Sequence, residues 1–106
     1  MSIIHYNDIK SPILQAAIVE PILIFCIKGS SIFEISCNIQ SMLTIPYAII
    51  KNYLFYLIDF EAISYNGQKK IFKISDGGLD LLYMIDKEKK QAKTDIKDIT
   101  ITFECE

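Results

Sequence analysis

The stretch from residue 44 to residue 86 constrains the fold more than any other part of the chain, because it predicts a helix, a tight hairpin and a second helix in direct succession. Thr44 is the predicted N-cap of the first helix, and Pro46 falls in its first turn, where a backbone N–H is not needed. Apolar residues then recur at helical spacing, at Ile50, Leu54, Leu57 and Ile58. The pattern predicts a helix over residues 44–58 with one buried side.

Two short apolar strands flank Asn66-Gly67 and predict a hairpin over residues 62–74. A two-residue loop at Asn66-Gly67 would place Ile63 opposite Lys70. A four-residue loop over residues 66–69 places Ile63 opposite Phe72 instead, and Tyr65 opposite Lys70. We favour the four-residue loop, because it leaves one apolar face and a polar tip.

Ser75 and Asp76 predict the start of another helix, over residues 76–91, with an N-cap and an acidic first turn. Beyond it, apolar and polar residues alternate over 98–105, which is typical of a half-buried strand. The predicted partner of this strand is residues 3–6 of the same chain or the equivalent strand of a second subunit.

Upstream of residue 44 the pattern is helical but interrupted by proline. Pro21 predicts either a kink in one helix or two short helical pieces, of which we favour the two pieces. Gly29 predicts the stop of the second piece. Ser31 followed by Glu34 is a capping-box pattern and predicts the start of the next helix. With a turn over 41–43, residues 31–58 are predicted to form a helix-turn-helix.

The composition predicts one domain over residues 1–106, because 106 residues with 51% hydrophobic content suffice for a single core. No apolar run reaches the roughly 18 residues of a membrane span, and no signal peptide is recognisable, so we expect a cytoplasmic protein without a membrane partner. The three cysteines are expected to be buried thiols, with a Cys26–Cys37 disulfide as the alternative. Catalytic motifs and metal-ligand patterns are missing and His5 is the only histidine, so we expect no enzyme activity, cofactor or metal.

The formal net charge is −2 and the chain has no arginine among its 11 basic residues. Residues 1–60 hold three lysines against four acids, and residues 61–106 hold eight against nine. Neither part is basic, so any cationic binding surface has to be local. The clearest local group is at the predicted hairpin tip, at Lys69 and Lys70.

Residues 45–82 resemble archaeal winged-helix regulators, which read roughly SYxxLKxYLxxLxxxGLI, a hairpin and then ITxxGxxFL. The matching positions are Tyr47, Ile50, Lys51, Tyr53, Leu54, Leu57, Ile63, Ile74, Ser75, Gly78 and Leu82. The resemblance implies an α+β winged helix-turn-helix fold, with a three-helix core, a hairpin wing, a further C-terminal helix and a terminal strand. It also implies a small, often dimeric protein that binds double-stranded DNA, with helix 44–58 in the major groove and wing 66–70 on the backbone. The chain departs from the family at Ile49, Asn52 and Phe55, where polar or charged residues are usual.

Helical geometry turns one arc of helix 44–58 outward when Ile50, Leu54 and Leu57 face inward. Asn52 could pair with adenine, Lys51 could reach guanine or phosphate, and Ala48 could contact a thymine methyl group. The predicted DNA-binding residues are Tyr47, Ala48, Lys51, Asn52, Phe55, Gln68, Lys69 and Lys70.

The helix from residue 76 has more apolar residues than one core contact requires, which favours a homodimer. The predicted dimer interface is formed by Leu79, Tyr83, Ile99, Ile101 and Phe103. The expected function is therefore that of a homodimeric transcriptional regulator. The alternative, favoured by the charge balance, is a winged helix that binds a protein partner and does not bind DNA specifically.

Overall fold

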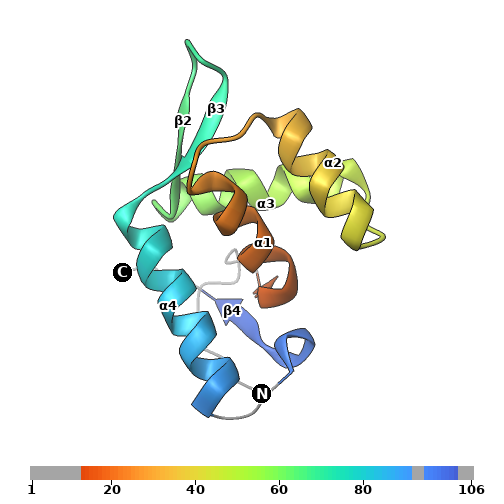
Figure 1. Cartoon of the computed structure of the whole chain (residues 1–106), viewed down its shortest axis with the longest axis vertical. Coiled ribbons are helices and arrows are strands. Elements are labelled where there is room, and N and C mark those ends of the chain that lie inside the picture. Colours follow the sequence, from red (N-terminus) through yellow and green to blue (C-terminus); the bar gives the residue numbers. More distant parts are fainter. Residues whose placement is uncertain (1–12, 92–94, 103–106) are drawn as a thin grey trace.

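A computed structural model describes residues 13–91 and 95–102 of the chain. Within these residues the fold is α+β, with four α-helices and two small antiparallel sheets (Figure 1). In chain order the elements are β1 (Ile13–Gln15), α1 (Ala16–Cys26), α2 (Ile32–Met42), α3 (Tyr47–Asp59), β2 (Ile63–Asn66), β3 (Ile71–Ile74), α4 (Asp76–Gln91), the 3-10 turn η1 (Ile96–Asp98) and β4 (Thr100–Thr102). The predicted α+β class is confirmed, and the order of the elements is compatible with a winged-helix arrangement.

The first helix, α1, is continuous, so the predicted break at Pro21 is wrong. A proline inside a helix costs about 3 kcal/mol, because it removes one hydrogen bond and crowds the preceding turn. Apolar side chains on both sides of Pro21 offset this cost, since each buried one contributes roughly 1.5–3 kcal/mol. The buried residues of α1 are Ala16, Ile18, Val19, Ile22, Leu23 and Cys26. Residues 13–15, expected to be helical, form β1 instead.

The second helix begins as predicted, with a complete capping box. Ser31 Oγ accepts a hydrogen bond from Glu34 N, and the Glu34 carboxylate accepts one from Ser31 N. The helix before it ends at Cys26 and is followed by Gly29 at φ +91°, a left-handed conformation that glycine adopts without strain. The predicted stop at Gly29 is therefore confirmed.

The turn between α2 and α3 lies later in the chain than predicted. The second helix continues to Met42, and α3 starts at Tyr47 with Pro46 as its N-cap, so Thr44 is not the cap. The reason is steric, because a residue that precedes proline is pushed out of the helical region. Ile45 is therefore disfavoured as a helical residue, so the helix does not start before Pro46.

The hairpin has the predicted four-residue loop, but its register differs by two residues from the prediction. Ile63 pairs with Ile74 and Tyr65 pairs with Phe72, so the loop runs over residues 67–70. The rings of Tyr65 and Phe72 lie 4.7 Å apart between centroids. A shift of two residues keeps every side chain on its predicted face. The aromatic contact replaces the predicted pairing of Tyr65 with Lys70.

A single core joins the helices to the base of the hairpin. Helix α1 lies at its centre, with α2, α3 and α4 around it and the hairpin projecting beyond them (Figure 1). The largest fully buried side chains are Leu14, Val19, Ile22, Leu23, Cys26, Ile35, Ile39, Ile50, Leu54 and Leu57. Ser30 is bridged to Phe72, with both backbone N–H groups donating to the opposite carbonyl, so β3 is fastened to the segment between α1 and α2.

The second sheet joins the two ends of the described chain. Strand β4 pairs with β1, where Leu14 lies opposite Ile101. The sequence alone did not predict β1 as a partner of this strand, and the predicted pairing with residues 3–6 or with a second subunit stays a prediction. Residues 3–6 and 103–105 lie outside the described residues. Tyr53 of α3 also contacts this sheet, since its hydroxyl accepts a hydrogen bond from Gln15 N at 3.0 Å.

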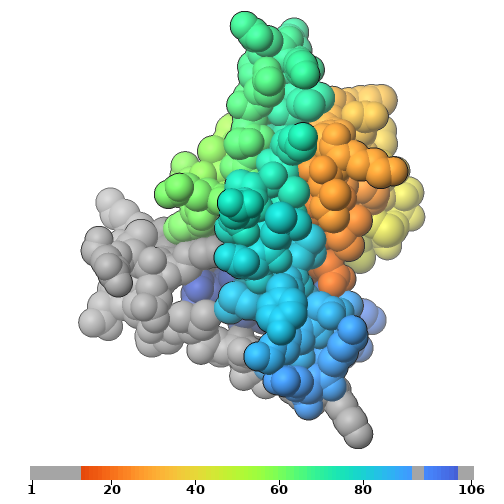
Figure 2. All heavy atoms as spheres, turned by 60° about the vertical axis from the view of Figure 1, so that its left-hand side comes forward, coloured from red at the N-terminus to blue at the C-terminus, as the bar shows by residue number. Residues whose placement is uncertain are grey.

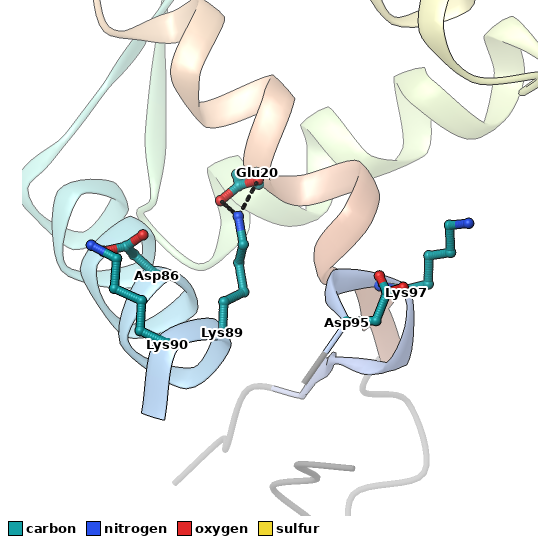
Figure 3. Close-up of polar contacts among 6 residues, drawn as sticks. All are labelled: Glu20, Asp86, Lys89, Lys90, Asp95 and Lys97. Carbon is teal, nitrogen blue, oxygen red and sulfur yellow. Dashed lines mark hydrogen bonds and ion pairs between the residues drawn. The ribbon is translucent and has the colours of Figure 1, made fainter. Parts of the chain in front are cut away.

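Helix α4 spans the predicted residues and packs against α1. Leu81 and Ile85 are buried on its inner side. The Lys89 ammonium group lies 3.2 Å from the Glu20 carboxylate, which ties the end of α4 to α1 (Figure 3). Both side chains are partly exposed, so this ion pair contributes less than about 1 kcal/mol. Apolar packing therefore contributes most of the stability of the contact between α1 and α4.

Candidate nucleic-acid interface

The outward face of α3 contains all five of the residues predicted for it. Tyr47, Ala48, Lys51, Asn52 and Phe55 are exposed. On the opposite side, the buried residues are Ile50, Tyr53, Leu54 and Leu57. The predicted orientation of the helix is therefore confirmed, and the face available to a partner is the one expected from the sequence.

Lys51 and Phe55 form a unit on this face. The Lys51 ammonium nitrogen lies 5.9 Å from the centroid of the Phe55 ring, one turn further along the helix. A cation over an aromatic face at this distance is attracted by about 0.5–1 kcal/mol at an exposed site. Phe55 is 52% exposed, so its ring both holds the lysine and remains accessible.

The hairpin tip carries the second predicted group of residues. Asn66 Oδ1 accepts hydrogen bonds from Gln68 N at 2.9 Å and from Lys69 N at 3.0 Å, which closes the loop. Lys70 N donates to Asn66 O at 2.7 Å, and Lys70 has φ +56°. Gln68, Lys69 and Lys70 are all exposed. The loop is thus ordered by the side chain and the backbone carbonyl of Asn66, and its long polar side chains extend into solvent.

A tight turn links α3 to the hairpin and to the start of α4. Ala62 N donates to Leu57 O at 2.8 Å, and Ser75 N donates to Ala62 O at 3.0 Å. The Ser75 hydroxyl donates to Glu61 O. Gly78 is buried where the first turn of α4 meets Ala62 and Ile74. We call this group of contacts, over residues 60–62 and 74–78, the junction. It positions the outward face of α3 and the hairpin relative to each other.

The residues of the predicted dimer interface lie in two different settings, some exposed and some buried. Leu79 and Tyr83 are exposed on α4, at 49% and 66%. Ile99 and Ile101 are buried in the chain's own core, at 3% and 7%, so they offer no surface to a second copy and their prediction is corrected. They are buried because η1 and β4 pack beside α1 and β1. Phe103 lies outside the described residues.

Sequence reasoning missed one lysine near β3. Lys28 is exposed and lies two residues before Ser30, which pairs with Phe72 of β3. Lys73, also exposed, is next to Phe72 on the same strand. No local sequence pattern identifies a strand partner this distant in the chain.

The two described cysteines are free thiols in different settings, so the alternative Cys26–Cys37 disulfide is wrong. Cys26 is buried, as predicted, but Cys37 is exposed, so its predicted burial is wrong. Cys105 lies outside the described residues. Burial raises the pKa of the Cys26 thiol from 9.0 to about 12. In the parts of the chain that the structure describes, no three His, Cys, Asp or Glu side chains gather into a possible metal site.

We expect iodoacetamide at pH 8 to modify Cys37 of the folded protein and to leave Cys26 unmodified. A thiol with a pKa of about 12 is a thiolate in roughly one molecule in ten thousand at this pH, and only the thiolate reacts. Peptide mapping by mass spectrometry distinguishes the two sites. Adding denaturant is the control, because it should make Cys26 reactive. Equal labelling of both cysteines in the folded protein would contradict the burial of Cys26.

No protein-family model matches the chain, and no match is found among curated proteins. Within residues 13–91 and 95–102, no helix has both the length and the apolar character needed to cross a membrane. Any function therefore has to be inferred from the residues of α3, the hairpin and α4.

Proposed function

We propose that the chain is a winged helix-turn-helix protein that binds double-stranded DNA, acting as a homodimeric transcriptional regulator. The observation that carries the proposal is the outward face of α3, with Lys51 and Asn52 exposed, followed at once by a projecting hairpin whose tip is formed by Gln68, Lys69 and Lys70. In this proposal α2 and α3 are the helix-turn-helix and the hairpin is the wing.

The proposed contacts divide into base readout and backbone contacts. Asn52 has an amide that can bond both N6 and N7 of adenine, and Ala48 suits a thymine methyl group. Lys51 reaches guanine or a phosphate, and its position beside Phe55 limits the directions in which it can extend. Lys69 and Lys70 contact phosphates, which fixes orientation but carries no sequence information. Without arginine, binding should be modest and sensitive to salt.

The first test is retention of a labelled pool of random duplex DNA at roughly 50 and 200 mM salt, followed by sequencing of the retained fraction. If the three lysines of each copy neutralise one phosphate each, a dimer neutralises six phosphates, and its affinity should fall roughly 2,000-fold between these two salt concentrations. Enrichment of a two-fold symmetric site is the result expected for a dimeric regulator. No retention even at the lower salt concentration would overturn the proposal.

We expect the triple variant Lys51→Glu, Lys69→Glu, Lys70→Glu to lose DNA binding, because it replaces three attractions to phosphate or base by three repulsions. A milder comparison uses Lys51→Gln and Lys97→Gln, which remove one charge each from exposed positions on α3 and on η1. The first should weaken binding in the retention assay and the second should leave it unchanged. Equal effects of the two substitutions on DNA binding would mean that only the overall charge of the protein matters. That result would contradict the placement of α3 in the major groove.

A second candidate is a winged helix that binds a protein partner and does not bind DNA specifically. It is favoured by the net charge of −2 and by the side chains of Tyr47, Ile49 and Phe55, which are large, apolar and exposed on α3. Under this alternative the triple lysine variant keeps its partner, because apolar contacts carry the binding. Phe55→Ala would then weaken partner binding more than the lysine changes do.

A further inference from the structure

The exposed side of α4 has an apolar centre. Leu79 and Tyr83 are one helical turn apart, so they lie on the same side, opposite the buried Gly78, Leu81 and Ile85. Helix α4 runs along one face of the molecule below the hairpin (Figure 2). Tyr83 is the more exposed of the two apolar side chains, at 66%. Two large apolar groups at the middle of an accessible helix form a candidate contact surface.

Charged residues lie on both sides of this apolar centre along the helix, and their sign differs between the two ends. Asp76 and Asp80 are exposed in the first half of the helix, and Asp86, Lys87 and Lys90 are exposed in the second half. At 3.6 residues per turn these residues, with Leu79 and Tyr83, lie within roughly 120° of the circumference. Lys90 is paired with Asp86 at 3.1 Å (Figure 3), so Lys87 gives the second half of this arc its net positive charge. The face is therefore acidic at one end, apolar at the centre and net basic at the other end.

The other charges of α4 do not belong to this face. Lys89 is bound to Glu20 of α1, and Glu88 is half-buried on the side toward the core. Met84 is exposed, at 54%, but lies roughly 100° around the helix from Tyr83, outside this arc. The set Asp76, Leu79, Asp80, Tyr83, Asp86, Lys87 and Lys90 is called the α4 face below.

We propose that the α4 face binds the α4 face of a second copy of the chain, with the two helices antiparallel about a two-fold axis near Tyr83. A two-fold axis perpendicular to a helix reverses its direction, so the acidic end of each helix meets the basic end of the other. Asp80 then lies near the partner's Lys87, Asp76 near the partner's Lys90, and the tyrosines pack together at the centre. The dipoles of the two helices also point in opposite directions in this arrangement, which is electrostatically favourable.

A parallel arrangement is disfavoured by the same charges, because it sets acid against acid and lysine against lysine. The face is thus self-complementary in one orientation only, which is what an isologous interface requires. The inference gives the homodimer of the proposed function a geometry. It is tested without DNA, so a monomeric chain that still retains DNA would overturn this interface and leave the DNA-binding proposal standing.

The experiment measures the oligomeric state of the full chain by sedimentation velocity over a series of protein concentrations. We expect the wild-type protein to dimerise, Tyr83→Glu to weaken the dimer at least tenfold, and Met84→Glu to leave it unchanged. The two substitutions put the same charge on neighbouring exposed residues of one helix. A difference between their dimer affinities therefore shows which side of α4 forms the interface. Circular dichroism checks that both variants are folded. A monomeric wild-type protein, or equal effects from both variants, overturns the proposal.

A charge exchange tests the antiparallel orientation. Asp80→Lys and Lys87→Asp should each weaken the dimer several-fold, because each creates like charges across the interface. The double variant should recover the wild-type affinity. Residues 80 and 87 are two turns apart on one helix and do not contact each other, so recovery can come only from a second copy. In a parallel pair residue 80 meets residue 80, the single changes have no such effect, and that result contradicts the proposed geometry.

Discussion

Replacing Gly78 with alanine is expected to lower the free energy of unfolding by about 3 kcal/mol, the upper end of the range for overpacking a core. An added methyl group would overlap the Ala62 carbonyl oxygen and would lie 2.5 Å from Cγ1 of Ile74. The obstacle is partly backbone, which cannot rotate away as a side chain can. Alanine is a better helix former than glycine by about 1 kcal/mol, so a net loss means that the clash outweighs this gain. Urea unfolding followed by circular dichroism measures the change.

Gly67→Ala is the matched control for this prediction. The same methyl group at Gly67 would have Tyr65 Cε2 as its nearest neighbour, at 4.0 Å. We expect the stability of this variant to be unchanged or raised by a few tenths of a kcal/mol, because alanine restricts the unfolded chain. Gly77→Ala should fall between the two, since its methyl group would lie 2.8 Å from Glu61 O. A Gly78→Ala protein as stable as the Gly67→Ala protein would show that the junction is looser than described.

Leu54→Ala is expected to destabilise the protein by about 2–5 kcal/mol, the cost of a cavity in a packed core. Leu54 is 1% exposed on the inner side of α3. The adjacent substitution Phe55→Ala removes a larger side chain from the outer face and should cost less than about 1 kcal/mol, including the attraction between the ring and Lys51. Chemical denaturation of both variants under identical conditions gives the comparison.

This pair of substitutions tests the surface on which the proposed function depends. If α3 were rotated so that Phe55 faced the core, the order of the two effects would be reversed. A reversed order would also remove Lys51 and Asn52 from the outward face. Because Phe55→Ala should leave the protein folded, the same variant serves in binding experiments to separate DNA contacts from an apolar protein interface.

The elements that depend on local chemistry were predictable from the sequence. The capping box of α2, the outward face of α3 and the full extent of α4 follow from helix caps and from apolar spacing, which act over three or four residues. The predicted start of α3 is too early, because the restriction that Pro46 places on Ile45 outweighs the capping preference of Thr44.

The features that depend on distant contacts were not predictable. Helix α1 continues through Pro21 because residues on both sides of it are buried by elements that follow later in the chain. Ile99 and Ile101 show the alternation of a half-buried strand, and the same alternation fits an intermolecular edge and a pairing with β1 equally well. The hairpin loop length was predictable, but the register was not, because Phe72 also has to pair with Ser30.

The junction leaves no flexible connection between the helix proposed to read DNA and the helix proposed to bind a second copy. Two copies joined through α4 would hold their α3 helices at one separation and one rotational offset. DNA repeats every 10–10.5 base pairs, so inserting about five between two half-sites would turn one of them to the far side of the duplex. Spacing, as much as base identity, would then determine which sites are occupied by a protein with a single lysine on α3.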